Sequence, residues 1–264
     1  MQYLSMSTPR PTLVFFAGAF ADPSCFDRVV PLFEKAGYSS VYVRVPSCNP
    51  DPSKLNSVSS SNDVSEARKN VLLPLIEEQH KDVIVIAHSY GGVVGGAAAA
   101  GLSKVARSSC GEAGGILGLV YWVGNIVSEG ESLFEAVGGA YPPFIKVGTP
   151  SPGLAVIDPV IPILYADCDT SSAPAFEAAM IPHALAAFET PAPAPAWAEP
   201  SFDGRRVYIR TAEDQCNPLF LQDIWIEKSK VSWDIADLKT SHCPFISCPE
   251  EIVAKTLTFI EKWT

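Results

Sequence analysis

Paired residues that would bind a metal or form disulfides are scarce in this chain. Its seven cysteines include no C-x-x-C pair, and its four histidines include no H-x-x-x-H pair. This spacing indicates neither a disulfide framework nor a zinc site. We expect buried or incidental thiols, no metal and no cofactor. The cysteines are Cys25, Cys48, Cys110, Cys168, Cys216, Cys243 and Cys248, and the histidines are His80, His88, His183 and His242.

Positive charge is also in short supply, with 19 lysines and arginines against 29 aspartates and glutamates and a formal net charge of −10. Such a balance argues against nucleic acid or an anionic membrane as a partner. No apolar run reaches the length of a membrane span, and the first residues lack a basic stretch followed by an apolar one. We expect a cytoplasmic protein, monomeric or homodimeric, whose partner is a small-molecule substrate.

Apolar runs alternate with helical patterns along the 264 residues, which is typical of a parallel sheet wound by helices. This length fits one large α/β domain with a doubly wound, mostly parallel sheet. Between residues 130 and 200 prolines cluster and aromatic residues become frequent. The pattern predicts a core formed by residues 1–129 and 201–264, with a helical lid inserted over residues 130–200.

The strands predicted for the core are short and mostly apolar. They cover residues 12–17, 40–45, 83–88, 116–123, 206–210 and 231–235. Helices are predicted over residues 26–36, from a cap at Asp63 to about residue 78, and from Pro249 to the end of the chain. Residues 48–62 are expected to form a loop, and residues 176–188 one or two short helices of the lid.

The most informative segment is V-I-V-I-A-H-S-Y-G-G at residues 83–92. It matches the strand–turn–helix motif G-x-S-x-G, with Ala87 in place of the first glycine. The sharp turn would hold Ser89 Oγ clear of the sheet, where an adjacent base can activate it. So short a match, taken alone, favours a turn that merely packs a helix on a sheet. The rest of the chain must therefore supply the partners.

Partners for Ser89 occur in the order expected for such a nucleophile, which is followed along the chain by an acid and then by a histidine. Asp214 follows a late strand in Y-I-R-T-A-E-D-Q-C-N-P, and His242 precedes the last helix in L-K-T-S-H-C-P-F-I-S-C-P-E. We expect His242 to act as the general base and Asp214 to hold its tautomer. Glu213 is the nearest alternative for the acid, and Asp237 is the next.

A tetrahedral oxyanion needs two backbone N–H donors, and removing one typically costs roughly 10²- to 10³-fold in rate. Tyr90, directly after the nucleophile, is expected to supply one donor. The other should come from the loop after the first strand, F-F-A-G-A-F, where Gly18 allows a tight turn. Ala19 is the first choice for this second donor, and Phe20 is the alternative.

Three aromatic residues, Phe20, Phe188 and Trp197, are candidates to line a substrate pocket, although ordinary core and lid packing explains each of them equally well. His88 directly precedes the serine, so its side chain should point away from the tip of the turn, and we expect a structural role. His183 falls in the lid, where packing or exposure at a rim is expected rather than catalysis.

Together these motifs resemble the α/β-hydrolase superfamily, specifically the compact branch that includes plant methylesterases, hydroxynitrile lyases and uncharacterised fungal hydrolases. The resemblance covers most of the chain, and its specific parts are the nucleophile turn and the histidine segment. It implies an α/β-hydrolase fold, and it implies the roles of nucleophile, acid and base for Ser89, Asp214 and His242.

Two departures from that branch bear on the reaction. Its lyases resemble one another in a lysine directly after the histidine and in a threonine at the position of Gly18, whereas this chain has Cys243 and glycine. Cyanohydrin cleavage is therefore disfavoured. Epoxide and haloalkane reactions, which need an aspartate nucleophile, are disfavoured more strongly because the turn keeps a serine.

We therefore expect a cofactor-independent serine hydrolase, an esterase or lactonase that cleaves a small or medium apolar ester, thioester or lactone through an acyl-enzyme. A substrate from secondary metabolism would suit the resemblance. Two alternatives stay open because fold alone does not decide chemistry. One is a small-molecule receptor that keeps the triad. The other is a non-hydrolytic lyase or cyclase that uses Ser89 and His242 only for proton transfer.

Overall fold

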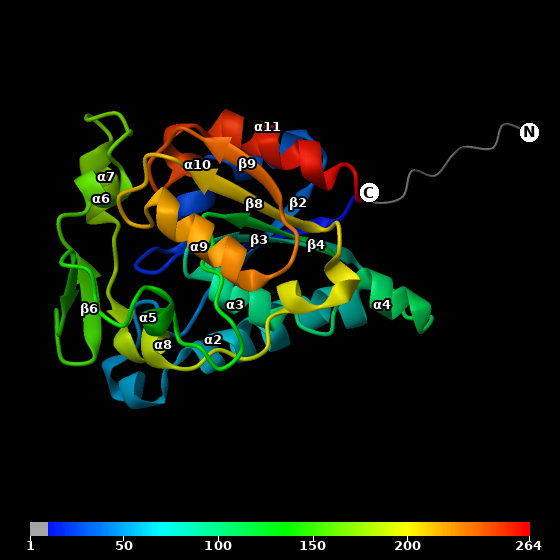
Figure 1. Cartoon of the computed structure of the whole chain (residues 1–264), viewed down its shortest axis with the longest axis horizontal. Helices are drawn as coiled ribbons and strands as arrows, with labels where there is room; N and C mark the ends of the chain where they lie inside the picture. Colours follow the sequence, from blue (N-terminus) through cyan, green and yellow to red (C-terminus); the bar gives the residue numbers. More distant parts are fainter. Residues whose placement is uncertain (1–9) are drawn as a thin grey trace, which may run out of the picture.

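A six-stranded sheet forms the centre of the protein, and each pair of neighbouring strands in it runs parallel (Figure 1). The computed structural model describes residues 10–264. The order across the sheet is β2-β1-β3-β4-β8-β9, which confirms the predicted α/β class with a mostly parallel sheet. The strands are β1 (Thr12–Phe16), β2 (Ser39–Val43), β3 (Asp82–His88), β4 (Gly115–Trp122), β8 (Arg206–Thr211) and β9 (Asp234–Leu238).

The direction in which the chain adds strands reverses between β1 and β3. From β1 it passes to β2 at one edge, and it then returns to place β3 on the other side of β1. The last residue of β1, Phe16, pairs with Ala87 near the end of β3. Ligands of open parallel sheets bind beyond the carboxyl ends of the strands at such a switch point. The loop after β1 and the turn after β3 therefore meet where a ligand is expected.

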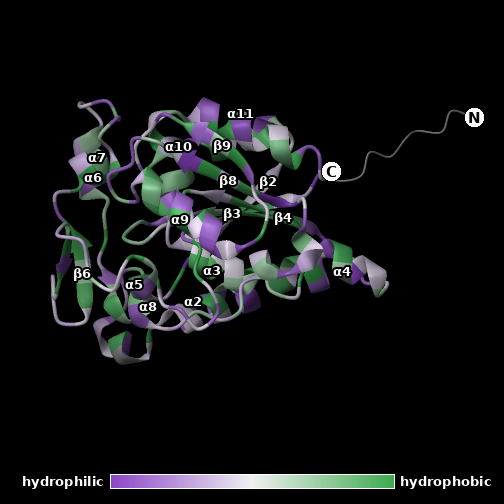
Figure 2. Cartoon of the chain, viewed as in Figure 1, coloured by the Kyte–Doolittle hydropathy of each residue, from purple (hydrophilic) through white to green (hydrophobic). Residues whose placement is uncertain are grey.

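The central strands are buried because helices cover both faces of the sheet. All eight residues of β4 are buried, as are all residues of β3 after its first. These strands stand out as hydrophobic in Figure 2. A nearly continuous apolar run is the sequence signature of a parallel strand covered on both sides, and it explains why the two strands could be predicted from the sequence.

Helices of the core lie on the two sides of the sheet, with α11 above the strands and α2, α3 and α4 below them in Figure 1. α1 packs against α11, and α2 packs against α3. In the part of the chain that the structure describes, no helix is both long and apolar enough to cross a membrane. The core helices are α1 (Val30–Lys35), α2 (Ser60–Ala67), α3 (Gly91–Ala98), α4 (Lys104–Ser109), α9 (Leu219–Ser229), α10 (Pro244–Ser247) and α11 (Pro249–Ile260).

Between β4 and β8 the chain leaves the sheet and forms short elements of its own. Three short strands make a small antiparallel sheet of order β5-β6-β7, which the sequence did not predict. Short helices surround it, as the change in composition led us to expect. The elements are α5 (Leu133–Ala136), β5 (Ile145–Val147), β6 (Leu154–Ile157), α6 (Ile161–Leu164), α7 (Ala173–Ala178), β7 (His183–Ala184) and α8 (Leu185–Glu189).

Several predicted boundaries were wrong. The helix expected over residues 26–36 is a 3₁₀ turn, Pro23–Phe26, followed by α1. The last strand is β9 (Asp234–Leu238), about three residues later than predicted. The loop expected over residues 48–62 contains a 3₁₀ helix, Pro52–Ser57, and the start of α2.

Asp63 was predicted as a helix cap, and this was also wrong. The N-cap of α2 is Ser59, whose side chain accepts a hydrogen bond from Asn62 N. Asp63 lies inside the helix with no exposed surface. Beyond α2 the helical path continues through two π turns, Arg68–Leu72 and Pro74–Glu78, so the predicted end near residue 78 was right. Two 3₁₀ turns, Ala196–Ala198 and Pro200–Phe202, precede β8.

Candidate active site

Ser89 occupies the tip of a sharp turn between β3 and α3, with a backbone φ of +50°. A non-glycine residue in this left-handed region is uncommon and is frequently found at functional sites. The two glycines after Tyr90 allow the close packing that the turn requires. A Cβ at Gly91 would lie 2.3 Å from Phe16 O, and one at Gly92 would lie 2.6 Å from Asn125 O. The strained serine is therefore held by tight packing on both sides of the helix start.

His242 and Asp214 are brought together although 28 residues separate them in sequence. His242 Nδ1 lies 2.8 Å from Asp214 Oδ2, and both side chains are almost fully buried. A histidine whose Nδ1–H donates to a carboxylate has its Nε2 free to accept a proton. Asp214 thus holds the His242 imidazole in the tautomer that a general base needs.

The Asp214 carboxylate is fixed in place by three further hydrogen bonds. Its Oδ1 accepts from the backbone N–H groups of Cys216 and Asn217, both at 2.8 Å, and its Oδ2 accepts from Thr211 Oγ1 at 2.8 Å. We did not identify these three residues from the sequence. The signal was available, because an aspartate followed by Q-C-N-P is typical of a turn in which the carboxylate accepts from N–H groups two and three residues later.

The two alternative acids have partners of their own. Glu213 Oε1 lies 3.6 Å from Lys239 Nζ at the surface. Asp237 accepts from Arg210 Nε at 2.6 Å, and this hydrogen bond holds the pKa of Asp237 below its usual value. Neither has a hydrogen bond to His242 within the described residues. The arrangement favours Asp214 as the partner of His242.

Ser89 and His242 line the same small cavity, of about 60 Å³. Two hydrogen bonds hold the loop that carries His242. His88 Nε2 lies 3.0 Å from His242 O, and Ser241 Oγ donates to Leu164 O at 2.9 Å. Burial, and then the neighbouring His242, lower the pKa of His88, so its ring is neutral and donates through Nε2. His88 therefore supports the loop that carries His242, and it also lines the cavity that contains Ser89.

The loop after β1 approaches the serine turn very closely. A Cβ at Gly18 would lie 2.9 Å from His88 Nδ1 and 3.1 Å from Ser89 Cβ, so only glycine fits there without a shift. Among the described residues, neither the Ala19 N–H nor the Tyr90 N–H has a hydrogen-bond acceptor. Two free N–H groups beside a serine can form an oxyanion hole.

Phe20, the alternative donor, is turned away from this position. Its N–H is directed at His183 Nδ1, 3.5 Å away, and its backbone φ is +64°. A donor committed to a buried acceptor is not available to an oxyanion. The geometry therefore favours Ala19 over Phe20 as the donor from this loop.

Ser89 also lines a larger cavity, of about 250 Å³, which does not include His242 among its lining residues. Two of the three aromatic candidates for a substrate pocket, Phe20 and Phe188, line this cavity, and their ring centroids are 5.8 Å apart. Trp197 does not: it lines neither cavity that contains Ser89, and a Cβ at Gly96 of α3 would lie 3.4 Å from its ring. Further lining residues from the segment between β4 and β8 are Leu133, Phe134, Val137, Tyr141, Pro142, Phe144 and Ile145.

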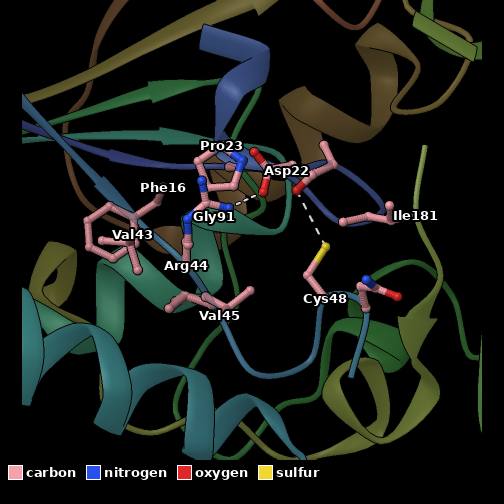
Figure 3. A pocket seen from close by; sticks show the side chains of 13 residues that line it. Phe16, Asp22, Pro23, Val43, Arg44, Val45, Cys48, Gly91 and Ile181 are labelled. Atoms are coloured by element: carbon pink, nitrogen blue, oxygen red, sulfur yellow. Dashed lines mark hydrogen bonds and ion pairs between the residues drawn. The ribbon is translucent and has the colours of Figure 1, made fainter. Parts of the chain in front are cut away.

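A separate cavity of about 200 Å³ is lined by residues of the loop after β1, among them Asp22 and Pro23, and by residues in and after β2, among them Arg44 and Cys48 (Figure 3). Its polar contacts are internal to the protein. Arg44 forms an ion pair with Asp22, and Cys48 Sγ donates to Ala21 O at 3.4 Å. None of the three predicted triad residues lines it. This cavity therefore does not belong to the candidate active site.

Sequence reasoning missed a second group of serine, histidine and aspartate, formed by Ser47, Asp63 and His183, each with no exposed surface. Asp63 accepts from Ser47 N at 2.9 Å, and Ser47 Oγ lies 3.0 Å from His183 Nε2. Burial raises the pKa of Asp63 to about 6 and lowers the pKa of His183 to about 3. These residues lie far apart in the sequence, so no local pattern marks them as a group.

The raised pKa of Asp63 has a consequence for stability. Because the folded protein binds this proton more readily than the unfolded chain, the associated stability is fully present below pH 3.8 and is lost as the pH rises through about 6. Between about pH 4 and about pH 7, the wild-type free energy of unfolding should fall by about 2 to 3 kcal/mol relative to Asp63→Asn, whose side chain does not titrate.

Urea titrations of both proteins across this pH range measure the difference directly. Asp203→Asn is the control for the change from aspartate to asparagine at an exposed position. The Asp203 carboxylate pairs with Arg206 at 2.7 Å. A difference between wild type and Asp63→Asn that stays constant with pH would show that Asp63 has an ordinary pKa.

Comparisons with known proteins agree with this architecture. Residues 13–255 match the model of a family described as the alpha/beta hydrolase family. The chain is 26% identical over 247 residues to the alpha/beta hydrolase nvfD of Aspergillus novofumigatus (strain IBT 16806). The aligned region covers 92% of this chain and 94% of that protein.

Two solved structures are similar in fold across nearly their whole length. A pyrethroid hydrolase from Sphingobium faniae JZ-2 superposes with a TM-score of 0.72 at 19% identity, covering 95% of this chain and 97% of that one. A methylesterase from Arabidopsis superposes with a TM-score of 0.68 at 20% identity, covering 96% of this chain and 100% of that one. At these identities the likeness concerns the fold. The family match extends from β1 into α11, and on this evidence the chain belongs to the alpha/beta hydrolase family.

Proposed function

We propose that this protein is a serine hydrolase that cleaves a carboxylic ester, thioester or lactone through an acyl-enzyme on Ser89. One observation carries the proposal. A serine in a strained turn shares a small cavity with a histidine whose Nδ1 is hydrogen-bonded to a buried aspartate. These are the parts of a nucleophile, base and orienting acid.

In the proposed reaction, His242 Nε2 accepts the Ser89 hydroxyl proton as Oγ attacks the substrate carbonyl. The oxyanion that forms accepts hydrogen bonds from the Ala19 and Tyr90 N–H groups. His242 then returns the proton to the leaving alcohol or thiol as the carbon–oxygen or carbon–sulfur bond breaks. Water repeats the sequence on the acyl-enzyme and releases the acid, while Asp214 stabilises the imidazolium in both halves.

The two cavities beside Ser89 favour one orientation of the substrate. The leaving group must lie on the His242 side because His242 gives it a proton, and the cavity on that side is the one of about 60 Å³. The acyl part then occupies the cavity of about 250 Å³, whose walls are mostly apolar side chains. We therefore propose esters of a bulky apolar acid with a small alcohol.

This orientation is tested with two esters of similar size and opposite shape. The methyl ester of 4-phenylbutanoic acid has a bulky acyl part, and 4-phenylbutyl acetate has a bulky leaving group. We expect kcat/KM to be about 10-fold or more higher for the methyl ester, since a few misplaced apolar groups cost that much in a fitted pocket. A higher kcat/KM for the acetate would reverse the assignment of the two cavities.

The same assay in ¹⁸O-labelled water separates hydrolysis from other chemistry. Hydrolysis through an acyl-enzyme places one labelled oxygen in the released acid. Products that contain no oxygen from water would instead favour the lyase or cyclase alternative. Absence of turnover, together with tight binding of the ester, would favour a receptor.

A further inference from the structure

Four polar side chains are buried together in one hydrogen-bonded group that includes Tyr90 and contacts the loop after β1. Ser47 follows β2, Asp63 lies in α2, Tyr90 follows the nucleophile and His183 begins β7. None of the four is more than 1% exposed. Tyr90 OH donates to Asp63 Oδ2 at 2.5 Å, and Ser47 Oγ donates to the same oxygen. A buried carboxylate that accepts several hydrogen bonds is held firmly in one position.

The donors and acceptors of this group define a single direction of hydrogen bonding. The backbone N–H of Phe20 can only donate, so His183 Nδ1 accepts and His183 Nε2 carries the proton. His183 Nε2–H then donates to Ser47 Oγ, 3.0 Å away, and the Ser47 hydroxyl donates to Asp63. This chain of hydrogen bonds thus runs from a backbone N–H in the loop after β1 to a carboxylate in α2.

This group is not a second catalytic triad. In it the carboxylate binds the serine, whereas in a triad it binds the histidine. Ser47, Asp63 and His183 have no exposed surface, and none of them lines a cavity that contains Ser89. No substrate can reach them, so their contribution has to pass through other residues.

The two ends of this chain of hydrogen bonds reach residues of the candidate oxyanion hole or their neighbours. One end is the N–H of Phe20, next to Ala19, and at the other end Asp63 also accepts from the hydroxyl of Tyr90. Phe20 is also held from its other side, because its carbonyl accepts from Ile181 N at 2.9 Å. Its positive φ is a strained conformation that persists only where the surroundings enforce it.

We propose that Asp63, Ser47 and His183 are positioning residues that fix the two oxyanion donors, Ala19 N–H and Tyr90 N–H, through the contacts at Phe20 and the Tyr90 hydroxyl. This inference rests on the proposed function. Oxyanion donors act only when they are aimed before the reaction at the place where charge develops. The buried chain of hydrogen bonds would orient the two donors in this way through its contacts at Phe20 and at the Tyr90 hydroxyl.

The test is Tyr90→Phe, which removes one hydroxyl and leaves the ring and the backbone N–H in place. We expect kcat to fall about 10-fold with KM changed less than about 3-fold, since the loss concerns a group that acts in the transition state. A trifluoromethyl ketone, whose adduct with Ser89 carries an oxyanion, should bind more weakly by the same factor. An alkylbenzene that fills the apolar cavity and has no oxygen atom should bind with unchanged affinity.

Tyr38→Phe is the matched control, because Tyr38 is equally buried and its hydroxyl has no hydrogen-bond partner in the described structure. It should leave kcat and both affinities unchanged. If Tyr90→Phe does not fold, Ser47→Ala interrupts the same chain at its centre and is judged by the same measurements.

The outcomes separate this inference from the proposed function. If the wild-type protein shows no turnover that depends on Ser89, the proposed function fails and the inference fails with it. If the wild type is active and Tyr90→Phe retains its kcat and its ketone affinity, only the inference is overturned. A variant that weakens the binding of ketone and alkylbenzene equally has lost general structure, which also overturns it.

Discussion

Alanine in place of Ser89 is expected to lower kcat for ester hydrolysis by about 10⁴- to 10⁶-fold, because no other group can form the acyl-enzyme. The fold should not change. Among the described residues, Ser89 Oγ has no hydrogen-bond partner whose loss would destabilise the turn. Initial rates with the preferred ester, at enzyme concentrations high enough to measure a slow residual rate, give the ratio directly.

Ser103→Ala is the matched control for this variant. Ser103 is also buried, and its hydroxyl donates to Ser201 O at 3.2 Å, close to the start of α4. It should retain the wild-type kcat. If Ser89→Ala kept more than about a tenth of the wild-type kcat, Ser89 would not be the nucleophile, because removal of a nucleophile costs several orders of magnitude.

The second largest effect is expected for Asp214→Asn, with a loss of about 10⁴-fold in kcat. The amide would fit the same space and could still contact His242 Nδ1 and Thr211. However, an amide N–H directed at Nδ1 would force the proton onto Nε2, and the base would then have no free nitrogen for Ser89. The same ester assay measures the loss.

The neighbouring acids supply two controls for Asp214→Asn. Glu213→Gln changes an exposed residue paired with Lys239, and Asp237→Asn changes one paired with Arg210. Both should stay within about 2-fold of wild type, since exposed ion pairs contribute little. A loss near 10⁴-fold in either control, with Asp214→Asn active, would move the role of the acid to that residue.

Local patterns sufficed for much of the fold, and they also pointed to Asp214 and His242, whose side chains the structure brings into contact. Buried parallel strands are continuous apolar runs, and β3 and β4 could be located from their sequence for that reason. The positions of Asp214 and His242 could be predicted because each follows a strand whose carboxyl end lies on the same edge of the sheet as that of β3.

Contacts between distant segments were beyond local reasoning. From the local sequence, Asp63 was interpreted as a helix cap. It is buried instead, because it accepts hydrogen bonds from Ser47, 16 residues away, and from Tyr90, 27 residues away. The strands of the small sheet have only two to four residues each, too short to show a period. Trp197 is aromatic and lies in a proline-rich stretch, but nothing in that stretch tells which face of α3 it packs against.

The most direct measurement is the mass of the protein after treatment with a fluorophosphonate, followed by peptide mapping of the adduct. Phosphonylation needs an activated serine that the reagent can reach, and Ser89 lines both cavities of the site whereas Ser47 has no exposed surface. We predict one adduct per chain, located on Ser89 and absent from Ser89→Ala. A folded protein that remains unlabelled, or an adduct on Ser47, would contradict the assignment of Ser89 as the nucleophile.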